Sequence, residues 1–529
     1  KSSPSVFFMF WPCNFCMSGW FKIVVIKHNF IFSSDISFDI RRTFFLCINA
    51  IYAAKFIVNL LFPAFEGIAN AIVSPCLIPL NTLDRILKGS ESPFVRVLSP
   101  VTKKFVRYVS QNVLGMIGMS LYILADTFFI SESVGANGIT ALNIVLPIYS
   151  FIFAIGAMIG VGSAIRFSIN KNKGSKSKTN YFFNALFWGT TIGLIFSLIG
   201  LFFPGQVVSI MGGDSTIVEV GRGYTMIFMS FAPFFIWNHI FNAFVLNDGS
   251  PSIAMSATLF SSLFNIIFDY VLMFPLNMGM EGAALATALS PIVGVMICFI
   301  HIFSKKNTTS LKPQKPSFKK LVYSCQVGIS SFVGQISSGV ITIVFNFLIL
   351  GLTGNTGVAA YGIVANVSLV GISVFNGVSQ GSQPLFSEHY GKGDKDGIKI
   401  LRRLSIITSL LFSAIMILLI FVFTDFIVGV FNSENNLLLE KYAVVGLRLY
   451  SIGFIFAGLN VVGSGIFSAT NFPKWAFATS IARGFVLIIL SAVVMSILFG
   501  MTGVWLAFAV AELLTLIITS VGLTKITKF

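Results

Sequence analysis

The stretch VGANGITALNIV occupies residues 134–145, and the similar stretch TGNTGVAAYGIV occupies residues 353–364, an offset of 219. A second pair repeats at nearly the same distance, with MGMEGAALA at 278–286 and FGMTGVWLA at 499–507, an offset of 221. Self-similarity at one spacing indicates two copies of one structural unit. The sequence therefore predicts two related halves, each about 220 residues long.

The composition places both halves in a membrane. Of the 529 residues, 55% are hydrophobic and only 10% are charged, and the mean hydropathy is +0.89. Soluble domains carry roughly 25% charged residues, so a soluble enzyme or binding module is excluded. Apolar segments long enough to cross a ~30 Å hydrocarbon core as helices recur along the chain. We predict twelve of them, at 105–131, 138–168, 181–203, 221–246, 252–275, 281–304, 321–351, 357–387, 400–424, 441–468, 473–499 and 503–524.

Basic residues collect in alternate loops of this array. The second, sixth and eighth loops carry Arg166, Lys171, Lys173, Lys176 and Lys178, then six lysines between 305 and 320, then Lys392, Lys395, Lys399, Arg402 and Arg403. The odd-numbered loops carry only Arg222 and Lys441. Cytoplasmic loops are enriched in Lys and Arg, so we expect the even loops and both ends of the 101–529 unit in the cytoplasm, as in a bacterial-type plasma membrane. Membrane topology thus accounts for the net charge of +16, which does not indicate a nucleic-acid partner.

These patterns divide the chain into four parts. Residues 101–304 form a first lobe of six helices, and residues 321–529 form a second lobe of six. The basic segment 305–320 links them in the cytoplasm. With an even number of helices in each half, the two lobes are parallel repeats, a design found in transporters. Residues 1–100 do not share the repeat and are an N-terminal extension of unknown role, either extra helices or, as we favour, sequence outside the natural start of the protein.

Four polar residues of the first lobe fall at a similar predicted depth. Asp126 lies five residues before the outer end of its segment, Asp269 lies six before, and Thr287 lies six after the outer start of its own. At ~1.5 Å per residue, all three lie roughly 8–9 Å below the outer boundary. Asn265 lies one turn below Asp269 on the same helix. Their oxygens are hard ligands for a sodium ion, and their carboxylates can also take up a proton.

The internal repeat provides a control for this site. Polar residues in membranes often only join helices, but Asn265, Asp269 and Thr287 are replaced in the second half by Val486, Leu490 and Phe508. Asp126 corresponds to Phe345, or after a one-residue slip to Asn346. The fold therefore does not require these polar groups, and we favour a functional site that couples transport to an ion.

Other polar residues lie inside the predicted helices of the second half. Arg483 and Glu512 lie near the middle of their helices, at depths where they can pair; a buried structural ion pair is the simpler interpretation. Gln380 and Gln383 share one helix face and either contact substrate or satisfy each other. We include all four as candidate residues of a substrate cavity.

Several short motifs resemble those of the multidrug and toxic compound extrusion (MATE) family over residues 95–525. They are Ala125-Asp126-Thr127, GANGITALN at 135–143, FNIIFD at 264–269, GAALAT at 282–287, AAYGI at 359–363 and SQGSQP at 379–384. The resemblance implies an all-α polytopic membrane protein, with twelve transmembrane helices in two pseudo-symmetric lobes that open outward as a V. By motif, the family's coupling residues correspond to Asp126, Asn265, Asp269 and Thr287, the same four residues that the depth comparison groups together.

We therefore expect a secondary active antiporter rather than an enzyme. The resemblance implies export of organic, cationic drugs in exchange for Na⁺ or H⁺, with Asp126, Asn265 and Asp269 as the expected ligands if the ion is Na⁺, and with no cofactor. The runner-up is a flippase for lipid-linked saccharides, which would need several cavity arginines where only Arg448 and Arg483 are available. We expect drugs and membrane lipids as partners, no nucleic acid, and a monomer. The sequence contains neither a Walker A motif, which an ATP-driven pump would need, nor an H-E-x-x-H motif that would indicate an intramembrane metalloenzyme.

Overall fold

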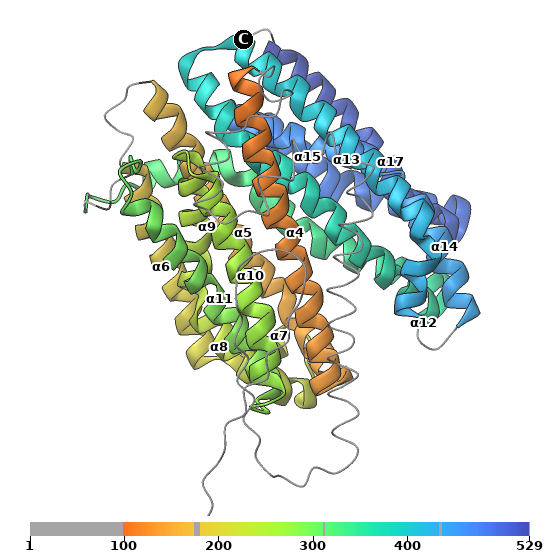
Figure 1. Ribbon diagram of the computed structural model, residues 1–529. Coiled ribbons are helices and arrows are strands. Elements are labelled where there is room, and N and C mark those ends of the chain that lie inside the picture. The colour runs from red at the N-terminus through yellow and green to blue at the C-terminus, as the bar shows by residue number, and fades with distance from the viewer. Residues whose placement is uncertain (1–98, 174–179, 310, 312, 433–435, 528–529) are drawn as a thin grey trace, which may run out of the picture. The chain divides into compact units, whose positions relative to one another are not determined.

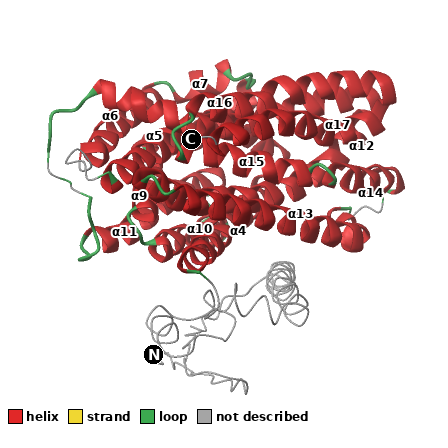
Figure 2. Cartoon of the chain, turned by 90° about the horizontal axis from the view of Figure 1, so that it is seen from above, coloured by secondary structure: helices red, strands yellow, loops and turns green. Residues whose placement is uncertain are grey.

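The structure is a computed structural model that describes residues 99–529, apart from 174–179, 310, 312, 433–435 and 528–529. The chain divides into two units, residues 1–74 and 75–529, and every described residue belongs to the second. Almost all of the predicted N-terminal extension therefore lies outside the described residues. Within the described ranges, every regular element is a helix and no strand occurs (Figure 2).

The helices of the first half begin at sequence signals typical of helix starts. Ser99 caps the first helix by accepting a hydrogen bond from the Thr102 amide at 3.3 Å, and Asp214 caps another by accepting from the Ile217 amide at 2.9 Å. Such caps satisfy amides that have no partner within the helix. The elements are α4 (Pro100–Val134), α5 (Ala136–Asn172), α6 (Asn180–Phe202), α7 (Pro204–Ile210), α8 (Ser215–Ser230), α9 (Ala232–Asn247), α10 (Pro251–Met273) and α11 (Gly279–Ile302) (Figure 1).

The second half contains longer continuous helical runs. Asp394 caps one of them by accepting from the Gly397 amide at 2.9 Å. A single π-helical turn, η3, interrupts the eleventh predicted segment. The elements are α12 (Phe318–Lys392), α13 (Lys395–Phe431), α14 (Leu437–Ser451), α15 (Phe454–Ala469), α16 (Pro473–Ile481), η3 (Ala482–Val486) and α17 (Leu487–Thr527).

Helices long and apolar enough to cross a membrane are numerous. In the described residues there are eight, or ten if each of two bent pairs forms one span. The 75 residues of α12 would extend ~110 Å as a straight helix, far more than a ~30 Å hydrocarbon core. Non-helical backbone interrupts α12 at Gly354 and α17 at Gly500, close to two predicted segment boundaries. These breaks support the twelve-helix count, which stays a prediction.

The two halves repeat one another in shape as well as in sequence. Helices α8 and α9 meet at a bend of 47°, and α14 and α15 meet at a bend of 48°. The bent pairs start at Ser215 and Leu437, which are 222 positions apart, close to both sequence offsets. Each half has its own hydrophobic core, one built around residues such as Phe182 and Phe228 and the other around Phe345 and Trp505.

The halves approach one another closely between α5 and α12. A Cβ on Gly162 would overlap the Ser324 carbonyl, and a Cβ on Gly328 would overlap the Met158 carbonyl. Only glycine permits this backbone-to-backbone contact. We call the helix ends next to the basic loops the basic side of the protein. The ion pair of Lys104 Nζ with Glu388 Oε1, at 3.4 Å, also joins the halves on that side.

Candidate functional site

The four coupling residues predicted from the sequence lie on three neighbouring helices of the first half. Asp126 belongs to α4, Asn265 and Asp269 belong to α10, and Thr287 belongs to α11. Residues along α10 pack against α4, as Thr258 does beside Gly115. Asn265 and Asp269 are fully buried, Thr287 is 4% exposed and Asp126 is 9% exposed. The predicted site is therefore a buried polar cluster between helices.

Most oxygens of this cluster have no hydrogen-bond partner. The Asn265 amide nitrogen donates to the Thr287 hydroxyl at 3.2 Å. Asn265 Oδ1, both carboxylate oxygens of Asp269 and Asp126 Oδ1 are buried and accept no hydrogen bond from the described residues. Buried polar atoms are usually paired, so several unpaired oxygens together are unusual. Unpaired carboxylate and amide oxygens provide what a hard cation such as Na⁺ needs from its ligands.

The two carboxyl groups are also electrostatically linked. Asp126 and Asp269 are close enough to interact, and two like charges in a membrane interior repel strongly. A bound cation or a proton would relieve that repulsion. Among the described residues, no three His, Cys, Asp or Glu side chains form a metal-binding group. Any ion bound here would therefore rely on two carboxylates together with neutral oxygens.

Sequence reasoning missed three tyrosines beside this cluster. Tyr122 lies one turn before Asp126, and its hydroxyl is 3.0 Å from that of Tyr149 on α5. Tyr122 and Tyr224 are both close enough to interact electrostatically with the two carboxylates. Only Tyr122 had a signal in the sequence, because it lies four residues from Asp126 and shares its helix face.

The helix ends refine the predicted depth. Asp126 lies eight residues before the end of α4, Asp269 lies four before the end of α10, and Thr287 lies eight after the start of α11. The predicted ends were displaced by two or three residues, so the common depth of 8–9 Å becomes a range of roughly 6–12 Å. Helix ends are the least certain part of any sequence-based assignment. The contacts between the residues, rather than equal depth, now define the site.

The equivalent region of the second half is aromatic. Phe345, at the position equivalent to Asp126, is fully buried and lies 6.3 Å from Tyr450 between ring centroids. Phe508, at the position equivalent to Thr287, stacks on Tyr450 at 4.2 Å with parallel planes. The same helical framework thus packs well with rings in place of the polar groups, which supports the interpretation that the fold does not need them.

Arg483 and Glu512 form the ion pair that their predicted depths suggested. Arg483 Nη2 lies 2.7 Å from Glu512 Oε1, and Arg483 belongs to the π-helical turn η3. Asn460 donates to Glu512 Oε2 at 2.7 Å and accepts from the Thr519 hydroxyl at 2.7 Å. Glu512 is therefore well satisfied inside the second half, in contrast to the carboxylates of the first half.

The remaining candidates have separate surroundings. Gln383 is 7% exposed, and a Cβ on Gly465 of α15 would lie 3.1 Å from its amide nitrogen. Gln380 is only half-buried. The structure thus does not pair the two glutamines with each other. His239 of α9 packs edge-on against Phe153, with ring centroids 5.0 Å apart, and its Nε2 is buried without a hydrogen-bond partner among the described residues.

Family comparison agrees with this arrangement. The family described as MatE matches residues 113–271 and 331–494, one segment in each half. The chain is 27% identical over 424 residues to "Multidrug export protein MepA" of Staphylococcus saprophyticus, covering 78% of this chain and 91% of that protein. It is 28% identical over 427 residues to the protein of the same name from Staphylococcus aureus, with the same coverage.

Solved structures share the fold. A structure described as the outward-facing conformation of a multidrug resistance MATE family transporter superposes with a TM-score of 0.76 at 21% identity, covering 81% of this chain and 97% of that one. A MATE protein in the straight conformation gives 0.76 at 20% identity, covering 82% and 98%. The chain belongs to the multidrug and toxic compound extrusion (MATE) family.

Proposed function

We propose that this protein is a secondary active antiporter of the plasma membrane that exports organic cations, including drugs, in exchange for Na⁺ or H⁺. The observation that carries the proposal is the set of buried, unpaired oxygens on Asp126, Asn265 and Asp269. The staphylococcal relatives are multidrug export proteins, which supports the substrate class.

The site acts through charge. Ionised carboxylates inside a membrane protein are costly unless they are paired or hydrated. A sodium ion or proton taken up by Asp126 and Asp269 neutralises part of that charge, and Asn265 Oδ1 provides a further oxygen for a metal ion. Exchange then requires only that the ion and the drug bind most tightly to different arrangements of the two halves.

The flippase alternative has little support from the arginines. Arg483 is already bound to Glu512 at 2.7 Å. Arg448 Nη2 lies 3.9 Å from Asp425 Oδ1, and Arg448 is 44% exposed. A pyrophosphate group would have to displace the Glu512 carboxylate to reach Arg483, which costs several kcal/mol for a buried pair. We therefore favour the antiporter.

Transport in proteoliposomes tests the proposal. The purified protein is reconstituted and loaded with a fluorescent organic cation, and a sodium gradient or a proton gradient is imposed separately. We expect one of the two gradients to drive efflux, and the responsive gradient identifies the coupling ion. Efflux that follows neither gradient would contradict antiport.

A further inference from the structure

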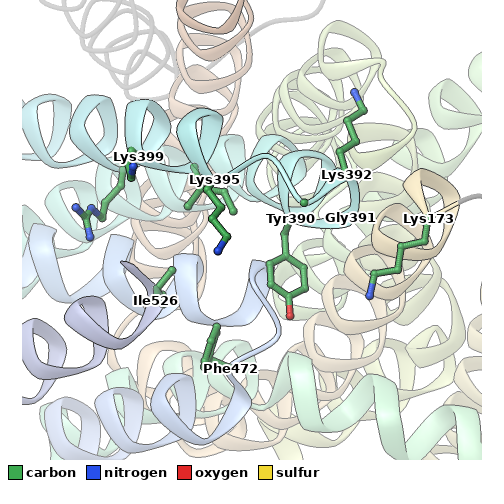
Figure 3. Close-up of a pocket in the computed structure, with 11 residues that line it drawn as sticks. Lys173, Tyr390, Gly391, Lys392, Lys395, Lys399, Phe472 and Ile526 are labelled. Carbon is green, nitrogen blue, oxygen red and sulfur yellow. The ribbon is translucent and has the colours of Figure 1, made fainter. Parts of the chain in front are cut away.

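A cavity of about 410 Å³ opens on the basic side, where the end of α5 meets the turn between α12 and α13 (Figure 3). Its lining includes five basic side chains, and the described residues that line it include no carboxylate. The basic residues are Lys173, Lys392, Lys395, Lys399 and Arg402. None of them belongs to the polar site of the first half, which lies near the opposite ends of the helices.

The charge of this cavity is only partly balanced by its neighbours. Lys392 Nζ pairs with Glu388 at 2.5 Å, and Lys399 Nζ pairs with Asp396 at 3.1 Å. Asp396 is 87% exposed, so water weakens the second pair. At least three positive charges remain without a carboxylate partner among the described residues.

Two of these three positive charges, those of Lys173 and Arg402, contact neutral groups. Lys173 Nζ lies 5.8 Å from the centre of the Tyr390 ring. Arg402 Nη1 donates to the Leu523 carbonyl at 3.4 Å, which leaves other guanidinium donors available. In Figure 3 the side chains of Lys395 and Lys173 extend on either side of Tyr390. The cavity therefore presents several N–H donors and an excess of positive charge.

Apolar groups complete the lining. Ile398, Phe472 and Ile526 face the same cavity, and Ile526 is buried. Contact with apolar side chains does not stabilise a bound inorganic anion, whereas a phospholipid has acyl chains that can pack on them as well as a phosphate. Basic pockets between transmembrane helices on the cytoplasmic side are a recognised way to hold anionic lipid headgroups.

We propose that this cavity binds a phosphate-bearing anion, with the headgroup of an anionic phospholipid as its source. Lys173 belongs to the first half of the repeat, and the other basic residues belong to the second. A phosphate bound here therefore contacts both halves and stabilises the arrangement in which their basic sides lie together. Membrane topology alone would place lysines in these loops, but it would not gather them around one cavity.

Lipid titration of the full-length protein in neutral detergent tests this proposal. Short-chain phosphatidylglycerol is compared with phosphatidylcholine and with inorganic phosphate, and bound ligands are counted by native mass spectrometry. The variant combines Lys173→Gln, Lys395→Gln and Arg402→Gln. A matched control combines Lys305→Gln, Lys306→Gln and Lys315→Gln, three exposed lysines outside the cavity with the same loss of charge.

We expect wild type and control to bind phosphatidylglycerol alike, and the cavity variant to bind it about tenfold or more weakly, because each basic residue contributes to anionic headgroup binding. A variant with Lys173→Arg and Lys395→Arg keeps the charge and should keep the binding. Phosphatidylglycerol should also raise the melting temperature of wild type but not of the glutamine variant.

Comparing the ligands distinguishes a lipid headgroup from free phosphate as the bound anion. If inorganic phosphate displaces the lipid at equal concentration, the cavity binds a free anion and the lipid assignment is wrong. If the cavity variant binds phosphatidylglycerol as wild type does, or the control loses it equally, the cavity is not the site. Neither result depends on whether the protein exports drugs.

Discussion

The amide nitrogen of Asn265 donates a hydrogen bond to the hydroxyl of Thr287 at 3.2 Å, across the contact between α10 and α11. Because the nitrogen is engaged, the carbonyl oxygen of Asn265 remains as an acceptor beside Asp269. That oxygen is buried and has no described partner. Thr287 thus orients a group that is free to bind a cation.

Replacing Thr287 with valine removes this orienting hydroxyl at nearly constant volume. We expect Thr287→Val to raise the ion concentration that half-saturates drug export by about tenfold, since leaving a buried amide without a partner costs ~1–3 kcal/mol. Thr287→Ser keeps the hydroxyl and should stay close to wild type. Export assayed over a range of ion concentrations measures both, and equal behaviour of the two variants would show that the hydroxyl plays no part.

Gly135 and Gly354 adopt nearly the same rare backbone conformation. Gly135 has φ 75° and ψ −156°, and Gly354, 219 positions later, has φ 66° and ψ −159°. Only glycine reaches this region without strain of ~1–3 kcal/mol. We expect Gly354→Ala to lower the melting temperature in detergent, whereas Gly351→Ala, at a neighbouring helical glycine with open space around it, should leave it unchanged or raise it. Equal melting temperatures for the two variants would contradict a tight turn at Gly354.

Asp248, just after α9, holds the start of the basic linker against the first half. It accepts hydrogen bonds from Lys171 Nζ at 2.6 Å, from the Thr308 amide at 2.7 Å and from the Thr308 hydroxyl, and it lies 2.9 Å from His301 Nε2. Burial raises the pKa of Asp248, but the hydrogen bonds from His301, Lys171 and Thr308 outweigh burial and bring the pKa below its usual range.

The lowered pKa sets the direction of a pH effect. A carboxyl whose pKa is depressed by folding contributes stability above its unfolded value of about 3.9 and loses that contribution as the pH falls through the folded value. Asp248→Asn should therefore cost about 3 kcal/mol near neutral pH, and the difference from wild type should shrink below about pH 4. Thermal unfolding at several pH values measures this, with the exposed Asp425→Asn as control. A deficit that stays constant down to pH 3 would show that the carboxylate charge is not involved.

Loop charge predicts which side of the membrane each helix end faces. In a cysteine-free background, a cysteine in place of Lys306, in the basic linker, should be protected from an impermeant thiol reagent added outside intact cells. A cysteine in place of Asn355, beside the Gly354 break and exposed, should react. The reverse labelling pattern would overturn the orientation.

The internal repeat explains why the fold and the polar site could be predicted from the sequence. Sequence offsets of 219 and 221 align Gly135 with Gly354 and Gly279 with Gly500, and all four have positive φ. The same alignment matches Asp126 with Phe345 rather than Asn346, and Phe345 occupies the aromatic core of the second half. A backbone conformation that requires glycine, and a buried position that requires an apolar side chain, can both be recognised from the residue types in a sequence.

Contacts between segments far apart in the sequence could not be predicted in the same way. Tyr149 comes near the carboxylates because α5 packs beside α4, and Tyr224 because α8 packs beside α5 and α11. A tyrosine in an apolar helix gives no sign of such a position by itself. The binding of Thr308 to Asp248, and the basic cavity that joins Lys173 to Lys395, likewise depend on tertiary packing between loops. The sequence shows that Asp248, Lys173 and Lys395 are charged and lie in predicted loops, but it does not show which residues they contact.

We propose that the buried carboxylates of the first half, Asp126 and Asp269, couple ion binding to export. Asp269→Asn tests it most directly, because the amide is nearly the same size but cannot carry the charge that the ion exchanges with. Wild type, Asp269→Asn and the surface control Asp425→Asn are reconstituted at equal protein levels, and export of a fluorescent organic cation is measured under the ion gradient that drives wild type. We predict that Asp425→Asn exports as wild type does and that Asp269→Asn, folded and equally abundant, does not export. Export by Asp269→Asn at the wild-type rate would contradict the account.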